Sequence, residues 1–269
     1  MWYLLYQRSI NEEIHNLKQK LWKNNKKEYS LIYGEKESIL RELDNYIPND
    51  DTIYNDIENS EVYKKIRNDT NRYRLNLLEI WDQSRKLYTK ELSNIMKASF
   101  DYEYSMLVVH PTLDVLEVDG KNNIIITGKR VTLKDKDDFL TYLIYKVVKA
   151  RFETLKYEDR DIINVILELI TLNELFTRMT HVSKYNYGKK ETYDLKKQIY
   201  PYWLMYLGVT EDNFDGYMVR DNIFFNKKDY EYNKTLKDLD IYDFISYCIK
   251  HKQRIFNVKP VTVEEIEII

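Results

Sequence analysis

Apolar residues recur at helical spacing along most of the chain, and the longest segment with this pattern covers 60–98. Four of its apolar residues follow a seven-residue repeat: Ile66, Tyr73, Ile80 and Leu87. At 1.5 Å per residue, a helix over this segment would be roughly 55–60 Å long. The repeat favours packing against other helices, within the chain or between chains. Polar residues occupy the companion positions (Thr70, Ser84 and Glu91), so a regular coiled coil is not predicted.

Two later helices are predicted to pair and to form the main core. The first is capped at Thr132–Asp135 and carries a wide apolar stripe from Phe139 to Leu155. The second covers 159–182 and is the most apolar helix of the chain. Both are long enough to bury a continuous apolar face, which is what stabilises a helix in a globular domain.

A narrow polar line runs along the otherwise apolar helix 159–182. Its members are Asp161, Asn164, Glu168, Thr171, Arg178 and His181. Glu168 is the residue to inspect first for a raised pKa and hence for acid chemistry, because apolar surroundings disfavour a charged carboxylate. The favoured interpretation is structural: the line faces solvent, or Glu168 pairs with Arg151 or Arg178.

The segment Tyr102–Arg130 has the strongest strand signature and separates the helical regions. Two β-prone runs, Leu113–Val118 and Asn123–Thr127, flank the dipeptide Asp119-Gly120. Asp-Gly between such runs predicts a β-hairpin. This hairpin would protrude as a ribbon between the two helical parts.

Acidic residues in the hairpin raise the alternative of a metal-dependent nuclease site. Asp114, Glu117, Asp119 and Lys121 are the residue types that such a site uses. Asp114 and Glu117 are three residues apart, and side chains alternate along a strand, so they point to opposite faces. Asp119 and Lys121 flank the turn and would point to solvent. His110 has no partner histidine nearby, and no metal or cofactor is therefore predicted.

The C-terminal part of the chain is predicted to add two more helices. One covers 191–207, is interrupted by Pro201 and is closed by Gly208 as its C′ residue. Residues 209–235 are predicted to be irregular, and a last helix follows over Asp238–Lys252.

Both ends of the chain are apolar and are candidates for contacts with other chains. The N-terminal sequence begins MWYLLYQR, and the C-terminal tail 253–269 is extended and β-branched. An extended apolar tail can add a strand to a sheet edge. The edge is either that of the chain's own hairpin or that of a neighbouring chain.

These patterns predict a mainly α fold of the α+β class: a helical bundle with one long helix, a central β-hairpin insert and an extended tail. The predicted regions are an N-terminal helical region, the hairpin insert, a helical core domain and the tail: 1–100, 101–130, 131–252 and 253–269. Gly (6) and Pro (4) are scarce, which agrees with long helices and few tight turns.

Composition argues against some classes of function but does not identify a reaction. The net charge of −2 does not indicate a nucleic-acid binder, although lysine clusters at 18–27, 184–197 and 250–254 keep that alternative open. The single cysteine, Cys248, allows no internal disulfide, and no signal peptide or membrane-length apolar run is present. We therefore expect the virion or the cytoplasm as the location. The 25 tyrosines, with abundant Asn, Lys and Ile, are typical of AT-rich genomes such as those of some bacteria and their phages.

No nucleotide-binding, zinc-protease or serine-hydrolase motif is found, so the expected function is non-enzymatic. We predict a structural or interaction protein of a larger assembly, such as a neck, ring, connector or internal protein of a phage virion. Its partners would be other copies of itself or other assembly proteins, with no membrane and no small-molecule ligand. The expected contact residues lie at the two ends and the hairpin tip: Trp2, Tyr3, Leu4, Leu5, Asp119, Gly120, Lys121, Val261, Val263, Ile266 and Ile268.

Three alternatives are kept. The first is a phage or bacterial inhibitor or adaptor that binds one host protein. The second is a nucleic-acid-associated protein that uses the lysine clusters. The third is an acid-dependent hydrolase with Glu168 at its centre.

Overall fold

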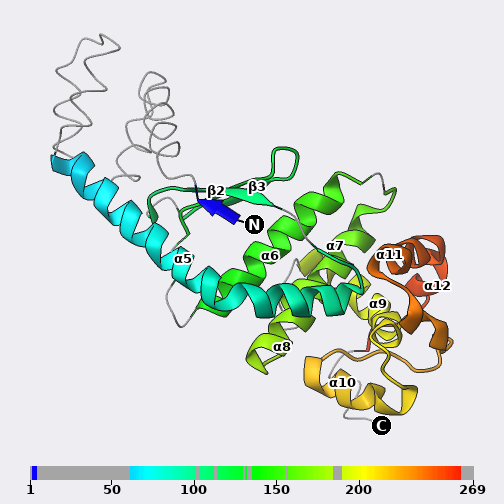
Figure 1. Cartoon of the computed structure of the whole chain (residues 1–269). Coiled ribbons are helices and arrows are strands. Elements are labelled where there is room, and N and C mark those ends of the chain that lie inside the picture. Colours follow the sequence, from blue (N-terminus) through cyan, green and yellow to red (C-terminus); the bar gives the residue numbers. More distant parts are fainter. Residues whose placement is uncertain are drawn as a thin grey trace. The chain divides into compact units, whose positions relative to one another are not determined.

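The computed structural model describes residues 2–4, 61–100, 103–111, 114–129, 131, 135–155, 157–183 and 190–261. These residues are mainly helical and include one small sheet, so the predicted mostly helical α+β class is confirmed (Figure 1). They fall into two compact units, which we describe separately. The sheet unit comprises the described residues up to Gln83 and those from 103 to 131, and the helical unit comprises residues 84–100 and 135–261.

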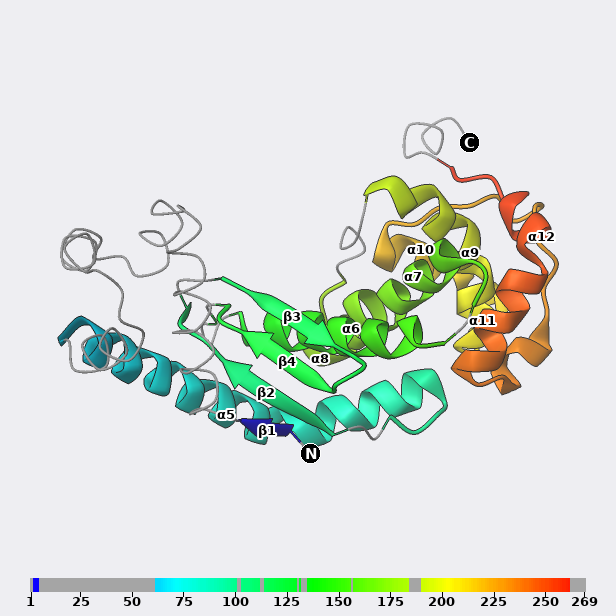
Figure 2. The ribbon, with the colours of Figure 1, turned by 90° about the horizontal axis from the view of Figure 1, so that it is seen from above.

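The sheet unit contains four strands in the order β1-β2-β4-β3 (Figure 2). Their bounds are Trp2–Leu4 for β1, Tyr104–Val108 for β2, Leu116–Asp119 for β3 and Ile124–Thr127 for β4. β1 and β2 are parallel, β2 and β4 are parallel, and β3 and β4 form an antiparallel hairpin. The predicted hairpin is present, and the short apolar run before it supplies the inner strand β2.

The hairpin turn differs from the predicted Asp-Gly turn. Asp119 pairs with Ile124, so four residues form the loop, and Asn123 rather than Gly120 has the positive φ, at 53°. Oδ1 of Asp119 accepts hydrogen bonds from the backbone N–H groups of Lys121 (2.9 Å) and Asn122 (3.2 Å). A carboxylate that accepts bonds from the following backbone fixes a turn by itself, so the glycine is not needed for its conformation.

The long helix α5 covers Glu61–Met96, close to the predicted bounds. Its first half buries residues at alternating spacings of three and four, and its second half buries Ser84, Tyr88 and Leu92 at spacings of four. Leu87, which the seven-residue repeat placed on the contact face, is 55% exposed and is therefore not buried within the chain. A strict seven-residue repeat drifts by about 20° per heptad on an α-helix, which moves the buried position from 87 to 88. The boundary between the two units lies at this change of phase, between Gln83 and Ser84.

Tyr73 attaches the first half of α5 to the sheet. Its hydroxyl donates to the backbone carbonyl of Lys129 and lies 3.4 Å from Oγ1 of Thr127 at the end of β4. Burial is the main cause that raises the pKa of Tyr73 to about 12, so the phenol stays neutral. The helix therefore contacts the sheet through a buried polar bond as well as through apolar packing.

The helical unit is built around the two predicted core helices. α6 covers Lys136–Glu153 and is buried on most of its circumference. The predicted helix 159–182 is instead three pieces: α7 (Arg160–Glu168), the π-helix η2 (Leu169–Leu175) and α8 (Phe176–Thr180). A π-helix keeps an apolar sequence but shifts the phase of the following residues, so apolar periodicity alone did not reveal it.

The remaining helices complete the core of this unit. They are η3 (Lys190–Thr192), α9 (Tyr193–Tyr206), η4 (Glu211–Asn213), α10 (Phe214–Asp221), η5 (Lys234–Asp238), α11 (Ile241–Lys250) and α12 (Lys252–Phe256). α9 and α11 meet through an aromatic cluster, in which the rings of Tyr206 and Phe244 lie 4.6 Å apart. Cys248 is fully buried, which agrees with its apolar sequence neighbours Ile245 and Ile249.

Two segments differ from the sequence prediction. Residues 209–235 were predicted to be irregular, but Phe214–Asp221 form helix α10, which begins after the short turn η4. The tail was predicted to be extended from residue 253, but Lys252–Phe256 form α12. Burial of Ile255 gives this short helix an apolar contact that its charged sequence did not suggest.

The C-terminus of α9 is held by two independent contacts. Gly208 has a φ of 82°, and its N–H donates to the carbonyl of Met205 while Val209 N–H donates to that of Leu204. This is the predicted C′ glycine in a Schellman motif. Lys97, just after α5, donates to the carbonyl of Tyr206 in the last turn of α9, and the Tyr206 hydroxyl donates to the carbonyl of Ile95 (2.8 Å).

Two glycine substitutions, one in the Schellman motif and one inside α10, are predicted to have opposite effects on stability. Gly208→Ala should lower the free energy of unfolding by about 1 kcal/mol, since alanine is strained at positive φ although the site has room for its methyl group. Gly216→Ala lies inside α10 with no atom near the new methyl group, and should raise the free energy of unfolding by about 0.5–1 kcal/mol. Urea denaturation of both variants measures the difference, and equal effects would contradict the assignment.

Candidate functional site

The polar line of the predicted helix 159–182 leads to the main candidate site, which lies inside the helical unit. Glu168, at the end of α7, is only 2% exposed, and its Oε2 lies 2.8 Å from Nζ of Lys196 on α9, which is fully buried. The two groups meet as an ion pair rather than as a well-directed hydrogen bond. The favoured expectation was solvent, Arg151 or Arg178, and it is wrong, because α9 covers this side of α7.

Burial and charge act in opposite directions on Lys196. Loss of water lowers the pKa of its ammonium, and the negative charge of Glu168 partly offsets that shift. An ion pair in such a place costs desolvation energy that only its partner recovers, so each charge depends on the other. Because neither group reaches solvent, a substrate could not reach the Glu168 carboxylate while α9 stays in place.

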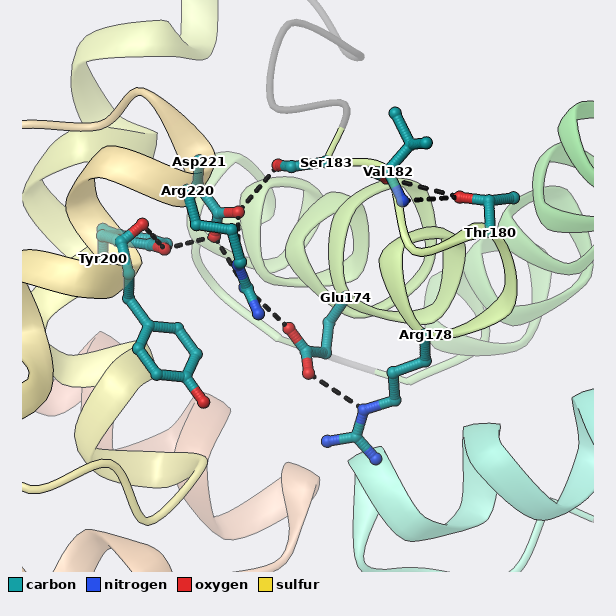
Figure 3. Close-up of polar contacts among 9 residues, drawn as sticks. Glu174, Arg178, Thr180, Val182, Ser183, Tyr200, Arg220 and Asp221 are labelled. Carbon is teal, nitrogen blue, oxygen red and sulfur yellow. Dashed lines mark hydrogen bonds and ion pairs between the residues drawn. The ribbon is translucent and has the colours of Figure 1, made fainter.

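A second, larger network begins at Glu174 in the π-helix (Figure 3). Oε1 of Glu174 accepts a hydrogen bond from Nε of Arg178 (2.9 Å), and Oε2 accepts one from Nη2 of Arg220 (3.2 Å). Nη1 of Arg178 also lies 3.2 Å from Oε2 of Glu91 on the second half of α5. One buried carboxylate thus links α8 to α10, and Arg178 links α8 to α5.

Asp221, the last residue of α10, collects the remaining donors of this network. The Arg220 guanidinium binds it in a forked arrangement, with Nε 2.7 Å from Oδ1 and Nη2 2.8 Å from Oδ2. Oγ of Ser183 donates to Oδ1 (2.7 Å), and the hydroxyl of Tyr200 on α9 donates to Oδ2. A carboxylate with four donors has little capacity left for a ligand.

The electrostatics of the network keep its arginines charged. Burial lowers the pKa of Arg220, but the hydrogen bond and charge of Asp221 raise it more, so the net shift is upward. Arg178 behaves in the same way, with Glu174 as the main opposing partner. Burial, followed by the charge of Asp221, raises the pKa of Tyr200 well above its usual value, so Tyr200 remains a hydrogen-bond donor.

The arrangement is suited to holding helices together. Three carboxylates (Glu91, Glu174 and Asp221) outnumber the two guanidiniums, so the network does not favour a bound anion. Within the described residues, no group of three His, Cys, Asp or Glu side chains is placed to hold a metal ion. The acids that could have served in catalysis are occupied by Lys196, Arg178 and Arg220.

None of the predicted contact residues that the structure describes is a member of this network. The backbone of Trp2–Leu4 forms β1 and pairs with β2, while Leu5, Val263, Ile266 and Ile268 lie outside the described residues. Val261 N–H donates to the carbonyl of Phe224 (3.1 Å), and Pro260 forms a bridge with Phe225. The tail was expected to pair with the hairpin or a neighbour, but its first residues pair with the segment after α10.

The hairpin residues are also used within the chain. The side chain of Asp119 holds the turn, which explains the lowered pKa of its carboxyl through hydrogen bonds from Asn122 and Lys121. Asp114 lies before β3 and forms an ion pair with Lys129 (3.7 Å), and His110 is buried. These residues do not converge on a metal site.

Most members of the network were missed from the sequence. Glu174 and Arg178 have the i,i+4 spacing of a helical ion pair, and this signal could have been used. Lys196, Arg220 and Asp221 lie in other helices and show no sequence relation to Glu168 or Glu174. Their meeting depends on tertiary packing.

Comparison of the chain with protein-family models, with curated proteins and with solved structures gives no match. Across the described residues, no helix is both long and apolar enough to span a bilayer.

The buried pair predicts strong coupling between Glu168 and Lys196. Lys196→Met leaves an unpaired carboxylate in the core and should lower the free energy of unfolding by about 3–5 kcal/mol. Glu168→Leu should have a similar effect, whereas the double variant should regain most of the loss, since it leaves no buried charge. A double-mutant cycle by urea denaturation measures the coupling, and additive losses would contradict it.

The Glu174 network predicts a smaller loss, because its arginines are about one third exposed. Glu174→Gln weakens both arginine contacts and should lower the free energy of unfolding by about 1–2 kcal/mol. The matched control is Asp69→Asn, which removes an exposed pair with Arg72 at 3.9 Å and should change it by less than about 0.5 kcal/mol. Equal shifts in the urea midpoint would show that the network does not stabilise the unit.

Proposed function

We propose that this protein is a non-enzymatic structural or interaction protein of a larger assembly. The observation that carries the proposal is Leu87, which occupies a helix-contact position of the seven-residue repeat yet is 55% exposed within the chain. A large apolar side chain at such a position is expected to pack against another helix, and here the partner would be another chain.

Further exposed apolar residues support contact with other chains. Leu75 on α5 is 51% exposed, Val219 on α10 is 70% exposed and Phe256 on α12 is 46% exposed. Single exposed apolar residues are ordinary on protein surfaces. Their weight here comes from Leu75 and Leu87 both lying on α5, the longest helix among the residues that the structure describes.

The kind of assembly is proposed from composition and architecture. A virion component of a phage, such as a neck, ring, connector or internal protein, agrees with residue usage typical of an AT-rich genome and with a long helix suited to interchain packing. A single host protein as the partner is the alternative, in which the protein acts as an inhibitor or adaptor.

Two other functions receive less support from the contacts. In the lysine cluster at 250–254, Lys252 lies 3.7 Å from Asp159 and Arg254 lies 2.5 Å from Glu231. Cations paired with acids are less available to phosphates, which does not favour nucleic-acid binding. For a hydrolase, the burial of Glu168 against Lys196 removes the central acid from any substrate.

The proposal predicts that Leu87→Asp weakens association. The purified protein should self-associate as its concentration rises. Leu87→Asp should shift the equilibrium towards monomer by about 2 kcal/mol, or roughly 30-fold in Kd, because it places a charge in an apolar contact. Sedimentation velocity over a concentration series measures this.

The matched control is Lys90→Asp, one turn away on the same helix at an exposed position. It introduces the same carboxylate and should leave the Kd within about twofold. A protein that stays monomeric at every concentration, or equal effects of the two variants, would remove the support that Leu87 gives to the proposal.

A further inference from the structure

A small cavity lies between α6 and α7 in the helical unit. Its volume is about 190 Å³, and it is lined by residues near the end of α6, by Leu155 and Tyr157, and by residues along α7. Phe152, Tyr157, Ile163 and Leu167 supply its apolar wall. Both helices belong to the core, so the cavity is formed by well-packed elements rather than by a surface loop alone.

The wall of the cavity is fixed in place by contacts behind it. The ring of Phe152 stacks on those of Tyr157 (6.5 Å) and Tyr242 (5.3 Å). The connection is held by Asp159, whose carboxylate accepts from the N–H of Ile162 at the start of α7. The cavity is therefore preformed, and a ligand would bind without first ordering it.

Two cations line this cavity without a counter-ion. Lys149 and Arg160 have no ion pair among the described residues, and the ammonium of Lys149 lies 5.9 Å from the centre of the Tyr145 ring. Glu153 is the one acid in the lining, so the lining carries net positive charge. Elsewhere in this unit, Arg178, Lys196 and Arg220 all have carboxylate partners. An apolar group that carries a carboxylate would match this combination.

The size of the cavity indicates how large the bound group is. It slightly exceeds a cavity of about 150 Å³ that holds benzene. It is smaller than the roughly 300–1,000 Å³ of sites that enclose a small-molecule ligand. Protein interfaces, in contrast, commonly place single anchoring side chains in pockets of this kind.

We propose that this cavity is the anchor site for an acidic peptide segment of an assembly partner. One aromatic or branched apolar side chain of the segment fills the space against Phe152 and Leu167, and neighbouring Asp or Glu residues meet Lys149 and Arg160. This inference rests on the proposed role as an interaction protein and specifies the chemistry of one partner.

The test uses the full chain and three capped tripeptides with a central Phe or Ala. Binding is followed by chemical-shift changes in the protein's NMR spectrum. Acetyl-Asp-Phe-Asp-amide should bind, whereas acetyl-Asp-Ala-Asp-amide and acetyl-Lys-Phe-Lys-amide should bind at least about tenfold more weakly. Each control peptide removes one of the two features, the apolar anchor or the negative charge.

Protein variants then locate the site. Arg160→Glu should weaken binding of acetyl-Asp-Phe-Asp-amide by about fivefold or more, because it replaces attraction by repulsion. Asn164→Trp should abolish binding by filling the cavity from its lining. Lys228→Glu makes the same charge change at an exposed position outside the cavity and should leave binding unchanged. Circular dichroism confirms that each variant is folded.

Several outcomes would overturn the proposal. These are no shifts on titration with any peptide, equal binding of the acidic and basic peptides, or unchanged binding in Arg160→Glu and Asn164→Trp. Tighter binding of free 3-phenylpropionate than of the acidic peptide would assign the cavity to a small carboxylic acid instead. Failure here with concentration-dependent association intact affects only this inference. Peptide binding by a strictly monomeric protein would count against the Leu87 contact instead.

Discussion

Burial of charge is the constraint on which the helical unit depends. Glu168 and Lys196 face each other out of reach of water, and neither could be buried without the other. A few residues later, Glu174 is shared by two arginines from α8 and α10. Apolar side chains could pack in several similar arrangements, whereas a buried charge is tolerated only where its partner lies. These pairs therefore select the arrangement in which α7, α9 and α10 pack, in addition to any net stability they contribute.

The π-helix explains how two acids of one apolar helical segment meet different partners. The intervening residues Leu169–Leu175 change the phase of the helix, and both Glu168 before them and Glu174 within them are directed into the helical unit. Thr171 in the same segment donates its hydroxyl to the carbonyl of Leu167 (2.7 Å), which satisfies a polar group that has no access to water. Polar residues in the most apolar helix are thus parts of the packing. Glu168 is therefore paired within the core and is not available as a catalytic acid.

The sequence was informative wherever local rules decide the structure. The bounds of α5, the hairpin, the Gly208 terminus of α9 and the buried Cys248 follow from periodicity, turn chemistry and apolar context. It failed where partners come from distant parts of the chain, as with Lys196, or where the phase changes within a helix, as in the π-helix. Local patterns carry no information about which distant cation meets a buried acid, and they assume one constant helical period.

Charged groups of the helical unit differ in whether an opposite charge lies beside them, and this difference bears on function. Most charged groups in the core of the helical unit have opposite charges beside them, so their chemistry is already used in folding. Lys149 and Arg160 differ, because they border the cavity between α6 and α7 and have no counter-ion among the described residues. Leu87 is an apolar residue without a partner in the core: it is exposed, although Tyr88 and Leu92 on the same helix are buried. Groups that folding leaves without partners are the ones available for binding, and here they combine apolar surface with positive charge. The proposed partner, which presents apolar residues among acids, would satisfy both.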